Sequence, residues 1–367
     1  MEKYRLDECC EILDSQRIPI TGADRVAGEY PYYGANGIQD YVADYIFDNE
    51  LVLLAEDGGN FGSKSKPIAY RVSGKCWVNN HAHVLKPKEM IDVDFLCYSL
   101  MFYNVDGMVN GATRQKLTQA AMRQMTIPKV EFSEQLVIVN KMKTVQGIIA
   151  ARKQQLVELD ILIKARFVEM FEGKEYCVDK LKNVCSKITD GTHKTPNYLD
   201  EGITFISAKN IVNGELDFSD IKYISEEEYQ EIQKRCQTEL NDILLSKSGS
   251  LGAPVIVKTT EKLGLFESLA VIKYDREKLL PEFLCEQLKT DTVQRQFTTG
   301  TKGVAIKHLH LGVIGETDII IPPVEHQEEF ADFVQQVNKS KAVVQAAHVI
   351  ARNLYSRRKQ KCRILNF

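Results

Sequence analysis

The chain has 367 residues, enough for two or three domains that each bury a core. Its 44% hydrophobic and 26% charged residues are typical of an ordinary folded protein, and no apolar run reaches the ~20 residues of a membrane span. The net charge of -3 excludes a uniformly basic protein, so contact with nucleic acid would need local clusters of positive charge.

The first third of the chain reads as a strand-rich domain. The run Pro31–Gly37 ends in Asn-Gly, a strong signal for a tight turn between strands. Tyr41–Phe47 is rich in aromatic and β-branched residues, and Leu51–Ala55 is an apolar run of strand length. Phe95–Tyr103 predicts a short helix and Met125–Ile127 a final strand, so this domain mixes strands and helices.

A long helix is predicted after this domain. Ser133 is a suitable N-cap, Glu134 suits the positive end of the helix dipole, and Gly173 supplies the stop. The apolar positions follow the 4-3 spacing of a coiled-coil seam: Ile138, Met142, Val145, Ile149, Leu156, Leu159 and Ile163, with Arg152 and Arg166 as interruptions.

A second strand-rich domain and a second long helix follow. The expected strands are Ile203–Ile206, Ile243–Leu245, Val255–Val257 and Asp318–Ile321, and the expected short helix is Phe283–Thr290. The second seam is Phe330, Val334, Val337, Val344, Ala351 and Tyr355, interrupted by Lys341 and His348. Both seams share one register, counted from Gln135 and Gln327, so the two helices should pair as a coiled coil. The predicted boundaries are 1–131 and 173–323 for the domains, and 132–172 and 324–367 for the helices.

The chain therefore reads as one unit written twice. The matching pairs are Tyr4 and Asp7 with Tyr176 and Asp179, Val52–Leu54 with Ile243–Leu245, Gly58 with Gly249, Asp94–Cys97 with Glu282–Cys285, Gly111 and Leu117 with Gly300 and Ile306, and Gln135 with Gln327. A duplicated chain can fold with pseudo-two-fold symmetry, which suits a nearly two-fold partner such as duplex DNA.

Positive charge is concentrated in segments that hold no acidic residue. These segments are Gly58–Lys88, Gly107–Lys129 and Gln294–His310. Two of them fall at matching places in the two halves, which favours a shared role in contacting phosphate over chance.

The sequence shows no catalytic motif. It has no phosphate-binding loop, no methyltransferase cofactor motif and no nuclease cluster of carboxylates and lysine. His81 and His83 would lie on one face of a strand, and the second half is expected to place Leu269 and Val271 there, which favours a packing role over a metal site.

An acidic pair, Glu56-Asp57, is a second candidate for catalysis. The second half has Lys247-Ser248 at these positions, and chemistry needed by both halves would not tolerate that exchange. The halves share an apolar framework and differ in polar residues, as two recognition modules with different targets would.

Several runs together carry a resemblance to a known family. They are Pro31–Gly37, Leu51–Gly59 and Val78–Leu85 in the first half, and Asp190–His193, Ile206–Ile211 and Ile321–Pro323 leading to Gln327 in the second. The chain resembles the DNA specificity subunits of type I restriction-modification systems along its whole length. The resemblance implies an α+β fold with two pseudo-symmetric target recognition domains joined by two long antiparallel coiled-coil helices.

The resemblance also implies a function. Each domain would read one half of a split target in double-stranded DNA, and the helices would set the gap. The subunit would bind no cofactor or metal and catalyse nothing itself. Its partners would be two methyltransferase subunits, which methylate adenine with S-adenosylmethionine, and motor-nuclease (restriction) subunits.

Nine cysteines without a CxxC pair and the absence of a signal sequence indicate a cytoplasmic protein.

Candidate DNA-binding residues follow from chemistry, since phosphates need cations or amides and bases need side chains that form hydrogen bonds. The candidates are Tyr33, Asn36, Lys64, Lys66, Thr113, Arg114 and Lys116 in the first domain, and Thr192, His193, Lys194, Lys209, Asn210, Lys247, Lys302 and Lys307 in the second. Two alternatives stay open: a specificity subunit of a related restriction system that is not type I, and a coiled-coil adaptor with two protein-binding heads.

Overall fold

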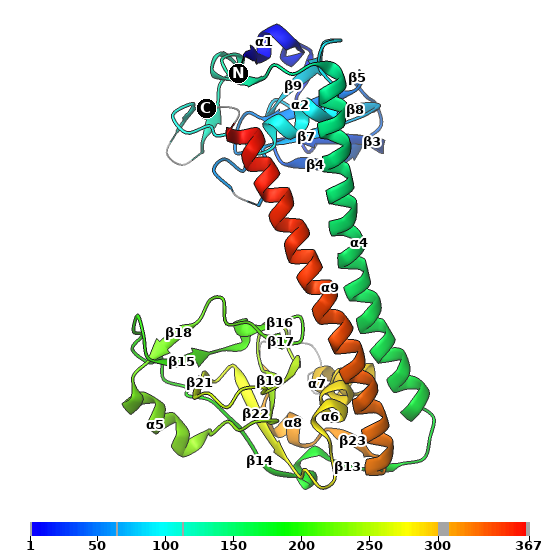
Figure 1. The fold of residues 1–367 in the computed structure, drawn as a ribbon, viewed down its shortest axis with the longest axis vertical. Helices are drawn as coiled ribbons and strands as arrows, with labels where there is room; N and C mark the ends of the chain where they lie inside the picture. The colour runs from blue at the N-terminus through cyan, green and yellow to red at the C-terminus, as the bar shows by residue number, and fades with distance from the viewer. Residues whose placement is uncertain (1, 64, 112–113, 300–307, 365–367) are drawn as a thin grey trace. The chain divides into compact units, whose positions relative to one another are not determined.

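The structure, a computed structural model, describes residues 2–63, 65–111, 114–299 and 308–364. Figure 1 shows two strand-rich parts and two long helices, α4 (Phe132–Phe171) and α9 (Val324–Ile364). The chain divides into two compact units, Met1–Gln154 with Gln345–Phe367, and Gln155–Val344. Each unit therefore holds one strand-rich domain and part of both helices.

The first unit is organised around an antiparallel sheet with the strand order β2-β9-β6-β7. Its strands are β2 (Cys10–Ile12), β9 (Ala82–Pro87), β6 (Leu51–Ala55) and β7 (Ala69–Val72). Leu54 on β6 belongs to one hydrophobic core and Leu53 to another. Strand β6 is thus buried on both faces, which explains why its sequence is continuously apolar rather than alternating.

A second sheet of the first unit has the order β4-β3-β8-β5. Its strands are β4 (Gly37–Val42), β3 (Ala27–Gly34), β8 (Lys75–Val78) and β5 (Phe47–Asp48). The predicted turn at Asn36 and Gly37 is confirmed, and Gly37 has the positive φ that such a turn requires. The single strand predicted over Tyr41–Phe47 is wrong: β4 ends at Val42, and Phe47 pairs with β8 instead.

The remaining elements of this domain are short. They are α1 (Leu6–Cys9), β1 (Lys3–Arg5) paired with β12 (Thr126–Pro128), α2 (Val93–Leu100), β10 (Val109–Asn110) paired with β11 (Lys116–Leu117), α3 (Gln119–Arg123), and a 3-10 turn at Asp14–Gln16. The Asp92 carboxylate caps α2 by accepting from the backbone of Asp94 and Phe95.

The second unit repeats the first sheet, in the order β14-β22-β19-β20. Its strands are β14 (Cys185–Asp190), β22 (Leu269–Tyr274), β19 (Ile243–Ser246) and β20 (Pro254–Ile256). Val52 pairs with Leu85 in the first sheet, and Ile243 pairs with Ile272 in the second. The predicted match of Val52–Leu54 with Ile243–Leu245 is confirmed by this pairing.

The other elements of the second unit frame that sheet. They are the three-stranded sheet β18-β15-β21 (Lys222–Ile224, Ile203–Ile206, Leu263–Leu265), the pairs β13–β23 (Cys177–Lys180, Asp318–Ile321) and β16–β17 (Ile211–Val212, Glu215–Leu216), the helices α5 (Glu226–Arg235), α6 (Pro281–Leu288), α7 (Asp291–Thr299) and α8 (Leu311–Gly315), and 3-10 turns at Leu181–Val184 and Ala208–Asn210.

Two predicted matches near the start of the two halves are wrong. The amide of Leu6 donates to Met125 and the amide of Leu181 donates to Thr317, so Leu6 and Leu181 are the equivalent residues. Tyr4 is therefore not equivalent to Tyr176, nor Asp7 to Asp179, because the true alignment is shifted by three residues. The shift arose because similar residue types were matched without the strand register.

Both long helices form where the sequence predicted them. Helix α4 begins at Phe132, where backbone amides donate to Glu131, so the expected N-cap Ser133 lies inside the first turn. Gly173 follows its end with a φ of 72°. The predicted seam positions of both helices are buried or half-buried, including Arg152, and this confirms the seam.

The helices run antiparallel within the second unit. Arg166 on α4 forms an ion pair of 2.6 Å with Glu329, and Asp160 forms one of 2.7 Å with Lys341. The earlier residue on α4 thus pairs with the later residue on α9, so the two helices run in opposite directions. In the first unit, the Gln146 amide donates to the Tyr355 hydroxyl at 2.7 Å. Among the described residues, no helix is apolar over a length that would cross a bilayer.

Candidate nucleic-acid interface

The loops that carry the basic candidates are held at one end of the central sheet. In the first unit, the amide of Glu56, just after β6, donates to His81 at 2.9 Å. The amide of Leu117 donates to Glu56 at 2.7 Å, and that of Gly58 donates to Gln115 at 3.1 Å. The segment after β6 is therefore fixed between two other loops of the domain.

The second unit has the same backbone bonds. The amide of Lys247 donates to Ser268, and that of Leu309 donates to Lys247, both at 2.8 Å. Lys247 is thus the equivalent of Glu56, as the sequence predicted, and Leu309 is the equivalent of Leu117. The predicted match of Leu117 with Ile306 is wrong for this reason.

Three predicted DNA-binding residues of the first domain meet around Gly58. The Asn36 amide donates to the carbonyl of Gly58 at 3.0 Å. Arg114 lies 2.7 Å from Asp57, and Lys116 lies 3.1 Å from Glu56. The side chains of Arg114 and Lys116 are 60% and 51% exposed, so both cations combine an acidic partner with access to solvent.

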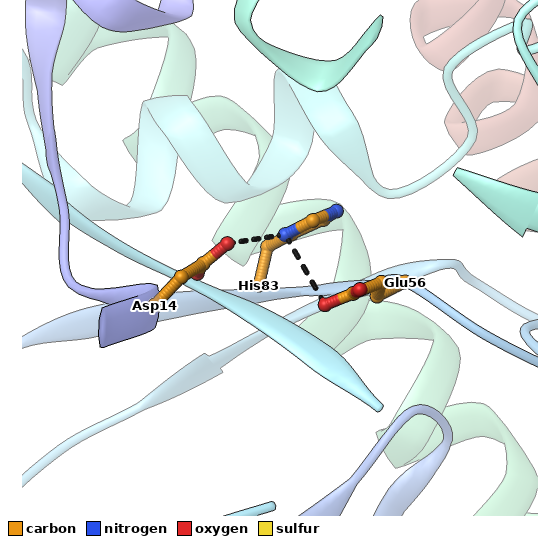
Figure 2. A group of neighbouring side chains, drawn as sticks. All are labelled: Asp14, Glu56 and His83. Carbon is orange, nitrogen blue, oxygen red and sulfur yellow. Dashed lines mark hydrogen bonds and ion pairs between the residues drawn. The ribbon is translucent and has the colours of Figure 1, made fainter. Parts of the chain in front are cut away.

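Figure 2 shows a cluster of three buried side chains, Asp14, Glu56 and His83, of which Glu56 is the partner of Lys116. His83 Nδ1 lies 2.6 Å from Asp14 Oδ2 and 3.6 Å from Glu56 Oε2, and Nε2 lies 2.9 Å from the carbonyl of Leu117. Both ring nitrogens of His83 therefore face oxygen atoms. His83 therefore ties β9 to the loop that carries Lys116.

The cluster has the residue types of a metal site, but its electrostatics do not fit one. The Arg17 guanidinium lies 2.6 Å from Glu56 and 3.6 Å from Asp14, and Lys116 bonds the other oxygen of Glu56. The chain's own cations thus occupy the carboxylates that a metal ion would need.

The packing role predicted for His83 needs correction. His83 is fully buried, but it is held by hydrogen bonds and lies opposite Leu54 on β6. Leu245 lies opposite Ala270 in the second half, so Ala270 and not Val271 is its equivalent. His81 lies before the start of β9, so the two histidines do not share a face of the strand.

The carboxylate of Asp14 is held by several hydrogen bonds. It accepts hydrogen bonds from His83, from the backbone amide of Val84 at 2.8 Å and from Gln119 at 2.9 Å. Burial alone would raise the pKa of Asp14, but these donors outweigh burial and hold its pKa below the ordinary value.

The second half holds a corresponding cluster around Asp190. This aspartate is 2% exposed and accepts hydrogen bonds from Lys247 and Arg235, and His193 lies 3.3 Å away. The other nitrogen of His193 lies 2.7 Å from Glu267. Burial would raise the pKa of Asp190, but Lys247, Arg235 and His193 hold it below the ordinary value.

The other predicted site residues are more scattered. Tyr33 is half-buried beside Tyr70, Thr192 is half-buried in a turn with Lys194, and Lys66, Lys194 and Lys209 are exposed. Lys247 and Asn210 are buried in structural contacts, the former with Asp190 and the latter with the backbone of Ser207, Asp217 and Asp220. Lys64, Thr113, Lys302 and Lys307 lie outside the described residues, as do Gly300 and Ile306.

Sequence reasoning did not single out five members of the two clusters as site residues: Asp14, Arg17, Asp190, Arg235 and Glu267. Asp14 and Arg17 are three residues apart, as are Asp190 and His193. Asp14 lies just after β2 and Asp190 is the last residue of β14, so both pairs stand at the end of the first strand of their sheet. A register-based alignment of the halves would have exposed this repeated spacing. No repeated spacing points to Arg235, because helix α5, which carries it, has no equivalent among the described elements of the first half.

Comparison with known proteins agrees with this duplicated architecture. The type I restriction modification DNA specificity domain matches residues 1–160 and again 173–346. A type I restriction enzyme specificity subunit of Haemophilus influenzae is 30% identical over 90% of this chain and 86% of that protein. The EcoBI specificity subunit of Escherichia coli is 22% identical over 64% of this chain and 56% of that protein.

Solved structures share the fold. The S subunit of a type I system from M. genitalium superposes with a TM-score of 0.56 at 12% identity, covering 98% of this chain and 95% of that one. A chain from a study of type I R-M complex assembly and conformational transition gives 0.57 at 15% identity, covering 98% and 97%. With two copies of the family domain along its length, this chain belongs to the type I restriction-modification DNA specificity family.

Proposed function

We propose that this protein reads a two-part target in double-stranded DNA, one half with each domain, as the specificity subunit of a type I restriction-modification complex. The observation that carries the proposal is the repeated sheet, whose loops are fixed by equivalent backbone bonds in both halves. In the first half those loops present Arg114 and Lys116 to solvent, where phosphate can replace their acidic partners.

We further propose that α4 and α9 set the gap between the half-sites and bind two methyltransferase subunits. Each helix exposes large apolar side chains outside its seam. These are Leu136, Val137, Ile148, Val157, Ile161, Leu162 and Val168 on α4, and Val343, Val349, Ile350 and Leu354 on α9. Apolar surface of this kind favours burial against a partner, and the duplication predicts two equivalent partners.

In this proposal the protein acts in the cytoplasm and catalyses nothing itself. The methyltransferase subunits supply S-adenosylmethionine and methylate adenine, and motor-nuclease subunits complete the restriction enzyme. Light scattering of the reconstituted complex should give two methyltransferase subunits for each copy of this chain. A saturated ratio of one to one would contradict the duplicated docking surface.

Genome-wide mapping of methylated adenines in cells with and without this chain tests the central proposal. The chain should be required for methylation of one two-part sequence with a constant gap. Loss of the chain without loss of any methylation would contradict it. If the purified complex binds no DNA sequence preferentially, the alternative of a protein-binding adaptor is favoured.

The length of the helices provides a second test. Inserting seven residues near Arg152 in α4 and seven near His348 in α9 keeps the heptad seam. The insertion adds ~10 Å of helix, which corresponds to about three base pairs at ~3.4 Å each. The gap should lengthen while both half-site sequences stay unchanged. An unchanged gap with full activity would show that the methyltransferases position the domains.

A further inference from the structure

Each long helix begins with a buried glutamine that is fully hydrogen-bonded. Gln135 lies in the first turn of α4 and its side chain is 0% exposed. Its Oε1 accepts from the backbone amide of Asp92 at 2.9 Å. Its Nε2 donates to the carbonyls of Met90 at 2.9 Å and Val130 at 2.8 Å.

Gln327 makes the same three bonds in the second unit. It is also 0% exposed, and its Oε1 accepts from the amide of Leu280 at 2.9 Å. Its Nε2 donates to the carbonyls of Lys278 and Pro322, both at 2.8 Å. The residue type, the burial and the bonding pattern are therefore repeated, although many polar residues differ between the halves.

The bonds connect three segments at one point, which we call the helix joint. Asp92 and Leu280 precede the short helices α2 and α6. Val130 and Pro322 lie between the last strand of a domain and its long helix. A planar amide with one acceptor and two donors engaged permits one orientation of these segments, whereas an apolar contact is not directional.

We infer that Gln135 and Gln327 are positioning residues that fix the direction of each long helix relative to its own recognition domain, and thereby hold the gap between the DNA half-sites constant. This inference rests on the proposed function, because the gap has meaning only for a two-part target. Neither glutamine contacts DNA, since both side chains are completely buried.

Two substitutions separate shape from bonding. Gln135→Glu and Gln327→Glu keep the size of the side chain and the bond from Asp92 or Leu280, but replace two donations by a carboxylate oxygen facing carbonyls. Gln135→Leu and Gln327→Leu remove all three bonds and leave a buried amide and two carbonyls without a partner. Either change should allow the joint to adopt more than one orientation.

The test maps methylation by the reconstituted complex on a pool of random-sequence DNA duplexes. The share of targets whose gap differs by one base pair should rise about tenfold in the variants, which corresponds to ~1.4 kcal/mol. The preferred half-site sequences should stay unchanged, because the sheets and loops are untouched. Hydrogen exchange at the Asp92 amide should be faster in the Gln135→Leu variant, which reports the lost bond directly.

Gln287→Leu is the matched control. Gln287 is a buried glutamine of α6 that donates to Ile320 at 3.3 Å and takes no part in the joint. The Oε1 of Gln287 is buried without a hydrogen-bond partner, so this variant should change stability little and keep the wild-type gap. Joint variants that exchange the Asp92 amide faster and yet retain one sharp gap overturn the inference. A wild-type complex that methylates no two-part target overturns the proposed function, and the inference with it.

Discussion

The two halves bury an aspartate at the same point of the same sheet and neutralise it with different residues. Each cluster contains two carboxylates, one arginine, one lysine and one histidine. The first consists of Asp14, Glu56, Arg17, Lys116 and His83, and the second of Asp190, Glu267, Lys247, Arg235 and His193. The charge on the residue after the central strand is reversed, from Glu56 to Lys247.

The comparison shows that duplication has preserved a physical requirement and not a set of residues. A buried carboxylate is costly unless cations and donors surround it. That requirement is met by His83 and Arg17 in the first half and by Lys247 and Arg235 in the second. The polar residues of the loops can therefore change while the backbone bonds at their base stay the same.

Removing the central carboxylates should have the largest effect. Asp190→Ala leaves the buried ammonium of Lys247 without its partner, and Asp14→Ala removes the acceptor that His83, the Val84 amide and Gln119 share. Each change should lower the free energy of unfolding by ~3–5 kcal/mol. Urea denaturation measures the change. Asp200→Ala, at an exposed position, serves as the control and should stay within about 0.5 kcal/mol of wild type. Equal stability of all three variants would mean that the clusters are not structural.

Reversing the charge at Glu56 or Lys247 should destabilise its domain, but less than removal of the central aspartate does. Lys247→Glu places a carboxylate against Asp190, and Glu56→Lys places an ammonium beside Arg17. Each should cost roughly 2–3 kcal/mol in urea denaturation. Lys247→Met should cost less, because the guanidinium of Arg235 still neutralises Asp190. If Lys247→Glu is as stable as Lys247→Met, like-charge repulsion is not the cause.

Loop cations of the two halves should differ in their effect on DNA binding. Arg114→Gln and Lys116→Gln should each weaken binding to all sequences and reduce the slope of affinity against salt by about one. Lys247→Gln should leave that slope unchanged, because its ammonium is buried against Asp190. Titrations at several salt concentrations decide this. A slope lowered equally by Lys247→Gln would place that lysine at the DNA.

The change of stability with pH should be the smallest effect. Stability should stay constant near neutral pH and fall only in acid. Asp14 and Asp190 have a lowered pKa in the folded state, so their stabilisation is present above the ordinary value of 3.8. It is lost as the pH falls through the folded-state pKa. Asp190→Asn should flatten the acid limb of the urea midpoint plotted against pH. An unaltered acid limb would contradict the lowered pKa.

The elements were easier to predict from the sequence than the contacts of the site. The Asn36-Gly37 turn and the strand Leu51–Ala55 follow from local residue preferences, and the structure contains both. The single strand over Tyr41–Phe47 failed because its two ends pair with different strands. Of the basic candidates, Arg114 and Lys116 are exposed beside the loop after β6, whereas Lys247 is buried.

The sequence by itself determined the duplication, the two long helices with their seams, and the equivalence of Gln135 and Gln327, because short-range periodicity and repeated order are written along the chain. Only the tertiary structure decided the pairing of Asp14 with His83, 69 residues apart, and of Asp190 with Arg235, 45 residues apart. Such pairs depend on strand register, and a shift of one residue turns every side chain to the opposite face. The register is fixed by the burial of whole sheets, so no local pattern specifies which charges meet.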